Sequence, residues 1–114
     1  MTETATTPTG AEPLLVITTV AEETMAGAIA REAVEQRLAA CVHVLPAGHS
    51  VYRWQQRVED AREHMLLLKT TAERYPSLEA WLMTRHPYET PEIIALPIAA
   101  GLPAYIDWIR QCTQ

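Results

Sequence analysis

The sequence predicts an α+β domain in which two helices cover one face of an antiparallel four-stranded sheet. Two observations carry this prediction. Strand-like and helix-like apolar patterns follow one another in the order β-α-β-β-α-β, and an amphipathic segment closes the chain. That order is typical of the ferredoxin-like split βαβ fold. A length of 114 residues suits one domain.

The first strand and helix are the clearest elements. Residues 14–20 are a nearly continuous apolar and β-branched run, which is typical of a strand in the middle of a sheet. Glu22 and Glu23 then favour a helix N-terminus, and apolar side chains recur every three or four positions over residues 25–33. We expect this helix to end near Leu38.

The chain before this strand has a different composition. Residues 1–12 are rich in Thr, Ala, Pro and Gly and contain no apolar cluster that could offset the entropy of ordering. We therefore expect a disordered tail over residues 1–12 and a folded domain over residues 13–114.

The middle of the chain predicts a long hairpin. Residues 40–54 have an extended pattern, interrupted at residues 46–48, and we interpret them as one strand with a bulge. Gln55 and Gln56 form a tight turn, which in type I′ geometry requires positive φ at both positions. The third strand covers residues 57–71 and is apolar on both faces at its centre.

The last third of the chain supplies the remaining elements. Pro76 begins a short helix that has to end before the His86-Pro87 pair, because a residue preceding proline avoids helical geometry. Residues 92–97 form a short fourth strand, and residues 103–112 form the closing helix.

One face of such a sheet has no helix to cover it. The central strands are longer than typical strands and apolar on both sides, so the uncovered face exposes more apolar surface than a monomer usually tolerates. We expect copies of the chain to pack on it.

Charge and motifs exclude several functional classes. The net charge is −5 and the nine Lys and Arg residues form no run, so no nucleic-acid partner is expected. No segment has the apolar length of a membrane span, and no secretory signal is recognised. With two cysteines, Cys41 and Cys112, expected to be free thiols, a cytoplasmic location is expected. Phosphate loops, nucleophile elbows and zincin motifs are absent, so we expect no enzyme.

Four stretches of the sequence resemble the CutA family. They are residues 15–19, residues 38–42, residues 50–54, and residues 68–70 followed by 86–93, the last reading HPYETPEI. The resemblance implies a cytosolic homotrimer of ferredoxin-like subunits, assembled like the PII signal proteins, and a role in tolerance of copper and other divalent cations. Some family members carry a cysteine and a further histidine, both discussed as metal ligands, where this sequence has Thr18 and Arg85.

The strongest candidate metal ligands lie in the proline-flanked loop. His86, Glu89 and Glu92 supply one imidazole and two carboxylates, a set that suits divalent copper or zinc. The alternative is that these side chains only hydrogen-bond neighbouring chains while the prolines stiffen the loop.

A second candidate pair is Cys41 and His43. Two residues apart in a strand, they share one face and could bind a soft ion if His49 or a neighbouring subunit completed the site. The alternative is that Cys41 is a small core residue.

Two aromatic residues and two cations suggest a different function. Tyr52 and Trp54 face one side of their strand and could form a ligand shelf or a subunit contact. Lys69 has to reach the sheet edge or pair with a carboxylate such as Glu92. With Arg85, these residues could bind a small anionic ligand between subunits, in a PII-like binding or signalling module. A structural trimer without a metal role is a third possibility.

Overall fold

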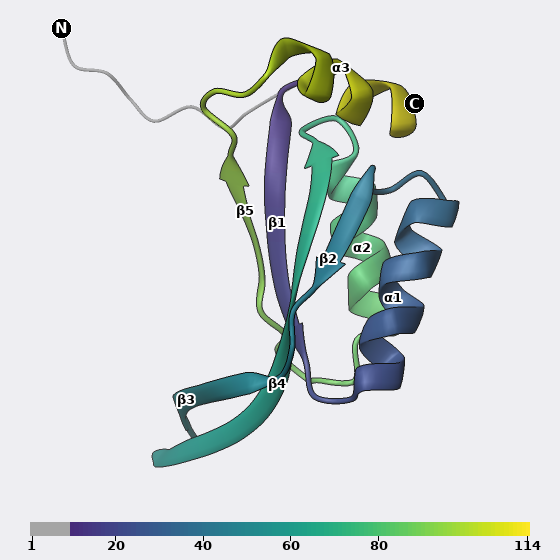
Figure 1. Ribbon diagram of the computed structural model, residues 1–114. Coiled ribbons are helices and arrows are strands. Elements are labelled where there is room, and N and C mark those ends of the chain that lie inside the picture. The colour runs from purple at the N-terminus through teal and green to yellow at the C-terminus, as the bar shows by residue number, and fades with distance from the viewer. Residues whose placement is uncertain (1–9) are drawn as a thin grey trace, which may run out of the picture.

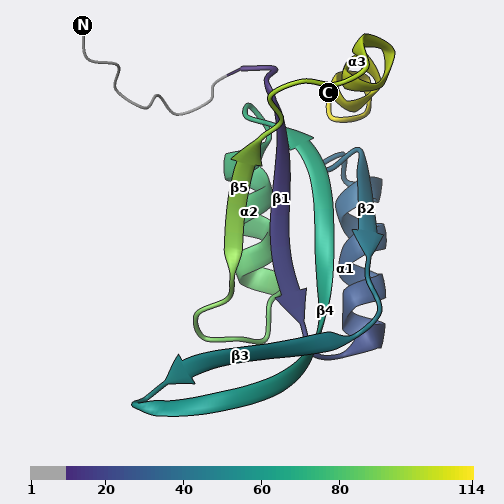
Figure 2. The same ribbon diagram turned by 60° about the vertical axis from the view of Figure 1, so that its left-hand side comes forward.

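The computed structural model describes residues 10–114 and has two layers, with helices α1 and α2 packed on the same face of an antiparallel sheet (Figure 1). The elements are β1 (Pro13–Val20), α1 (Glu23–Glu35), β2 (Cys41–Val44), β3 (Gly48–Trp54), β4 (Arg57–Thr71), α2 (Tyr75–Arg85), β5 (Ile93–Pro97) and α3 (Pro103–Cys112). Helix α3 lies across one end of the sheet (Figure 2). The predicted α+β fold and its element order are confirmed.

The sheet has the strand order β2-β4-β1-β5, with β3 also paired to β4, and all neighbours are antiparallel. Five strands stand where four were expected, because the predicted second strand divides into β2 and β3. Val44 lies opposite Leu66 and Gly48 opposite Glu63, so the three residues 45–47 between β2 and β3 face only the two residues 64–65 of β4. The predicted bulge is thus confirmed between the two strands.

Strand β4 is 15 residues long and serves two parts of the molecule. Its C-terminal half pairs with β1 and β2, and its N-terminal half pairs only with β3. The β3–β4 ribbon, residues 48–63, projects from the sheet as an arm (Figure 2). Its turn has φ of 50° at Gln55 and 67° at Gln56, which confirms the expected type I′ signs.

The core lies between the sheet and the two helices. Alternate side chains of β1 and β4 are buried with apolar residues of α1 and α2, and the fully covered ones include Val16, Ile29, Leu66, Leu68, Leu78 and Leu82. The period of two in the strands and of about 3.6 in the helices puts these side chains on facing surfaces. Helix α2 ends at Arg85 because Pro87 holds His86 in an extended conformation, with ψ at 134°.

The opposite face of the sheet is apolar, as the sequence predicted. Ile17 lies between Leu67 of β4 and Ile94 of β5, and Leu15 lies beside Leu96. Ile94 is 49% exposed and Leu96 is 44% exposed. We call this surface, formed by the outward side chains of β1, β4 and β5, the open face.

The last three residues of the predicted tail contact the folded domain. Residues 1–9 of the predicted tail lie outside the described residues, but residues 10–12 are held by hydrogen bonds. Ala72 donates its backbone N–H to Glu12 O at 2.8 Å, Glu73 donates to Gly10 O at 2.7 Å, and Arg110 donates to Ala11 O at 2.9 Å. These partners come from distant parts of the chain, which residue composition alone does not reveal.

Within residues 10–114, no helix combines the length and apolar character needed to cross a membrane.

Candidate functional site

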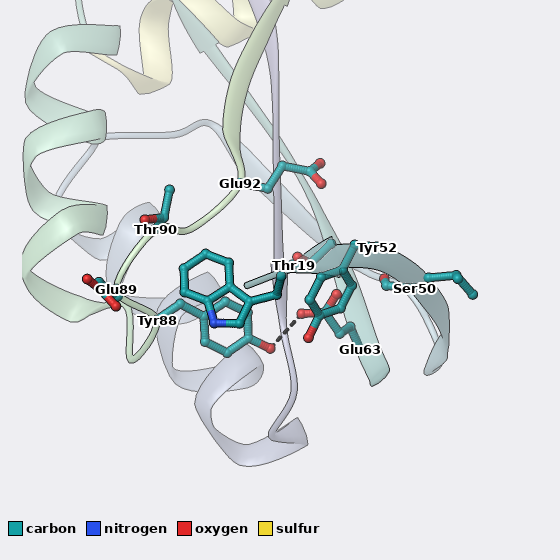
Figure 3. Close-up of a pocket in the computed structure, with 10 residues that line it drawn as sticks. Thr19, Ser50, Tyr52, Glu63, Tyr88, Glu89, Thr90 and Glu92 are labelled. Carbon is teal, nitrogen blue, oxygen red and sulfur yellow. Dashed lines mark hydrogen bonds between the residues drawn. The ribbon is translucent and has the colours of Figure 1, made fainter. Parts of the chain in front are cut away.

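The main candidate site is a cavity of about 630 Å³ where the arm meets the sheet (Figure 3). One wall comes from β3 of the arm, the second from the end of β1 and the neighbouring part of β4, and the third from the loop between α2 and β5. The lining residues are Thr19, Ser50, Val51, Tyr52, Trp54, Glu63, Tyr88, Glu89, Thr90 and Glu92.

The strand periodicity explains how the arm contributes to the cavity. Ser50, Tyr52 and Trp54 alternate along β3 and therefore share one face, which is turned toward the loop. Tyr52 is 44% exposed and Trp54 is 41% exposed. The two rings that were predicted to form a shelf or a contact thus form part of a cavity wall.

The charged lining residues are all carboxylates. Among residues 10–114, no Lys or Arg side chain lines the cavity, whereas Glu63, Glu89 and Glu92 do. Glu89 and Glu92 are exposed, but Glu63 is only 8% exposed. The cavity therefore favours a positively charged occupant over an anion.

Glu63 is held by a short hydrogen bond. Tyr88 donates its hydroxyl to Glu63 Oε2 at 2.5 Å, and Figure 3 shows the phenol directed at that carboxylate. Burial and this hydrogen bond raise the pKa of Tyr88, so the phenol keeps its proton and remains the donor. Nothing in the local sequence pattern marks Glu63, since a charged residue in an extended ribbon normally faces solvent.

The His86 side chain is buried below the surface of the loop and does not line the cavity. It is buried, its Nε2 is 2.8 Å from the carbonyl oxygen of Thr19, and its Nδ1 accepts the backbone N–H of Tyr88 at 3.2 Å. Both ring nitrogens of the neutral imidazole are thus engaged, with Nε2 as the donor. Binding a metal would require His86 to give up one of these buried hydrogen bonds.

The predicted metal ligands do not converge on one point within a single copy of the chain. Glu89 and Glu92 share the cavity, with His86 behind them. In the part of the chain from residue 10 onward, no three His, Cys, Asp or Glu side chains are close enough to surround one ion. A multidentate site would need ligands from another copy.

Cys41 and His43 lie on the open face of β2, opposite Lys69 and Leu67 respectively. They share a face, as the spacing predicted, but His49 does not join them. His49 is on the arm, where its Nδ1 is 3.0 Å from Asp60 Oδ1. Cys41 is partly exposed rather than a core residue, and its Sγ lies 3.7 Å from the hydroxyl of Tyr105.

Lys69 has a different partner from the one expected. Its Nζ donates to the hydroxyl of Tyr105 at 3.1 Å, and the pairing with Glu92 does not occur. The hydrogen bond to Tyr105 raises the pKa of Lys69 against the opposing effect of burial. Tyr105 comes from α3, which packs against the end of the sheet, and the sequence of β4 does not identify it.

Arg85 lies far from the open face. It makes two hydrogen bonds to Glu32 of α1, at 3.0 and 2.9 Å, and so joins the two helices. Lys69 and Arg85 are thus on opposite faces of the sheet, and neither lines the cavity that contains Tyr52 and Trp54. The structure does not bring the four predicted anion-binding residues together within one copy.

Thr18 is fully buried and faces the helices. In the described part of the chain its Oγ1 is the one buried side-chain oxygen or nitrogen without a hydrogen-bond partner.

Comparisons with known proteins agree with the fold and with the family resemblance. A sequence profile of the CutA1 divalent ion tolerance protein family matches residues 14–112. The divalent-cation tolerance protein CutA of Thermus thermophilus is 48% identical over 99 residues, covering 87% of this chain and 96% of that protein. Protein CutA of Mus musculus is 41% identical over 96 residues, which are 84% of this chain but 54% of the longer mouse protein.

Solved structures show the same architecture. The structure of the divalent cation tolerance protein Cut A1 from Thermus thermophilus superimposes with a TM-score of 0.87 at 46% identity, covering 90% of this chain and 99% of that one. CutA from Xylella fastidiosa gives a TM-score of 0.88 at 39% identity, covering 90% and 99%. Because the profile spans nearly all of the described residues and the fold agrees throughout, the chain belongs to the CutA1 divalent ion tolerance protein family.

Proposed function

We propose that this protein contributes to divalent-cation tolerance by binding copper or zinc weakly at the carboxylate-lined cavity. The observation that carries the proposal is that every charged side chain lining the cavity, within the described residues, is a glutamate. The names of the relatives, divalent-cation tolerance proteins, point to the same class of ligand. A binding role rather than catalysis fits this set of residues.

Glu89 and Glu92 are the proposed metal ligands. They are exposed in the cavity and lie in the loop of residues 86–92, where Pro87 and Pro91 restrict the backbone before each of them. Carboxylate oxygens bind both ions, but divalent copper and zinc bind more tightly when an imidazole joins the carboxylates, and His86 is occupied by Thr19 and Tyr88. Weak binding is therefore expected from one copy alone.

A homotrimer would complete the site. The open face exposes Ile94, Leu96 and Met65, and covering it with other copies removes this apolar surface from water. That the assembly has three subunits is taken from the family resemblance, whereas the expectation that other copies cover the open face rests on its exposed apolar side chains. Light scattering at micromolar concentration tests this part, with an expected mass near three times 12.7 kDa.

We propose a cytoplasmic location, which fits the two free cysteines. A relative from Archaeoglobus fulgidus, 30% identical, is described as periplasmic. Cell fractionation with an antibody against the chain decides between the two compartments.

Calorimetry on chelator-treated protein tests metal binding. The double variant Glu89→Gln, Glu92→Gln should weaken Cu²⁺ and Zn²⁺ binding by about tenfold or more, because each substitution removes a charged ligand. The matched control is Glu22→Gln, Glu35→Gln, which makes the same charge change on the exposed surface beside α1. Equal affinities for the double variant and the control would exclude the cavity as the metal site.

A further inference from the structure

Glu63 is a buried carboxylate without a cationic partner. Only 8% of its surface is exposed, and it forms no ion pair with any residue from 10 to 114. A carboxylate with so little exposure loses part of its hydration and is stabilised by donors or cations placed beside it. The hydrogen bond from Tyr88 offsets part of this cost but brings no charge.

The second oxygen of Glu63 faces the cavity. Oε2 accepts from Tyr88, while Oε1 accepts no hydrogen bond from any described side chain or backbone group. Among the described residues, the one side-chain oxygen or nitrogen that is buried from solvent and has no hydrogen-bond partner is Thr18 Oγ1. Glu63 Oε1 also has no partner within the protein, so it must be accessible to solvent, and the cavity is where Glu63 is exposed. A free, charged acceptor therefore lies on the cavity wall.

Three aromatic side chains line the same cavity as this acceptor. Tyr52 and Trp54 come from β3 and Tyr88 from the loop, and all three line the cavity. The electron-rich faces of tyrosine and tryptophan attract cations, and their large apolar area suits alkyl groups. Aromatic rings beside carboxylates are typical of sites for organic ammonium ions.

The arrangement of the three carboxylates argues for an elongated ligand. Figure 3 shows Glu63 well separated from Glu89, with Glu92 on a third side. No three acidic, cysteine or histidine groups of the described chain converge closely enough for one metal ion. A volume of about 630 Å³ is also much larger than a hydrated ion needs and lies in the usual range for small-molecule sites.

We propose that the cavity binds a linear aliphatic diamine or polyamine. One ammonium group donates to Glu63 Oε1, the alkyl chain packs on the rings of Tyr52 and Trp54, and a second ammonium group reaches Glu89 or Glu92. This inference goes beyond the proposed metal binding. The metal needs Glu89 and Glu92, whereas the diamine also needs Glu63 and the aromatic wall.

Calorimetry on the full chain, with 1,6-diaminohexane and spermidine as probes, tests the proposal. Hexane-1,6-diol is the matched neutral ligand and should not bind. The variant Glu63→Gln keeps an acceptor for Tyr88 but removes the charge, and it should weaken diamine binding about ten- to a hundredfold. The variant Glu73→Gln, at the opposite end of β4, makes the same charge change on an exposed residue and should bind like the wild type.

A second variant separates binding from folding. Tyr52→Leu leaves the carboxylates in place and should weaken diamine binding about three- to tenfold, because it removes part of the aromatic surface on which the alkyl chain packs. The proposal is wrong if neither amine binds at millimolar concentration, if the diol binds as well as the diamine, or if Glu63→Gln and Glu73→Gln bind the diamine equally. Zn²⁺ binding is measured on the same samples, and its retention in Glu63→Gln with loss of diamine binding shows that the two ligands use different residues.

Discussion

Removing the hydroxyl of Tyr88 is expected to destabilise the fold more than removing a tyrosine hydroxyl that binds an exposed glutamate. The variant Tyr88→Phe deletes the 2.5 Å hydrogen bond to Glu63 and leaves a carboxylate that is 8% exposed without this donor. Hydrogen bonds to charged groups contribute about 1.5–3 kcal/mol, so we expect the free energy of unfolding to fall by about 2 kcal/mol. For a domain of this size the melting temperature should drop by roughly 8 °C.

The chain contains its own control for this measurement. Tyr75 donates to Glu79 Oε2 at 2.7 Å, the same pair of groups, but here the carboxylate is exposed to water although the tyrosine ring is partly buried. Tyr75→Phe should therefore cost only about 0.5 kcal/mol. Urea unfolding at one fixed protein concentration measures both variants, since assembly makes stability depend on concentration. Equal losses for Tyr88→Phe and Tyr75→Phe would refute the argument that burial makes the Glu63 bond strong.

Three further predictions concern pH, the chain start and the open face. Burial and the hydrogen bond to Glu79 raise the pKa of Tyr75 from 10.0 to about 12, so the contribution of Tyr75 to stability is present below pH 10 and is lost as pH rises toward 12. In Tyr75→Phe the melting temperature should therefore depend less on pH between pH 10 and pH 12 than in the wild type. Deleting residues 1–12 should lower the melting temperature by several degrees relative to deleting residues 1–9, because three hydrogen bonds to residues 10–12 are lost; equal melting temperatures would contradict this. Ile94→Lys places an ammonium on the open face and should shift the light-scattering mass toward 12.7 kDa, whereas the exposed control Met83→Lys on α2 should not.

Much of the fold could be predicted from the sequence because local patterns determine most of its elements. These patterns act within a few residues: the apolar run of β1, the proline in the first turn of α2, and the His86-Pro87 pair that ends this helix. The type I′ turn at Gln55 and Gln56 was predictable from strand pairing on either side, although neither residue favours positive φ.

The site was less predictable, because its decisive contacts join distant segments. Thr19 O bonds His86 across 67 positions, and this one contact removes the imidazole from the set of free metal ligands. Tyr88 lies 25 positions from Glu63, and Lys69 lies 36 positions from Tyr105. Residue type indicated which side chains could bind a ligand. Which of these side chains are already hydrogen-bonded to other residues of the chain is decided only by the tertiary packing.

The walls of the cavity differ in rigidity because one of them belongs to the arm. Tyr52 and Trp54 stand on a two-stranded ribbon whose residues 51–58 are all exposed, whereas Glu63 lies at the point where β4 enters the sheet. Two-stranded ribbons are marginally stable alone, so the arm should open locally more often than the core, with faster amide hydrogen exchange over residues 51–58 than over residues 64–71. The β3 wall with Tyr52 and Trp54 can therefore move while Glu63 stays in place, and the width of the cavity depends on the local stability of the ribbon.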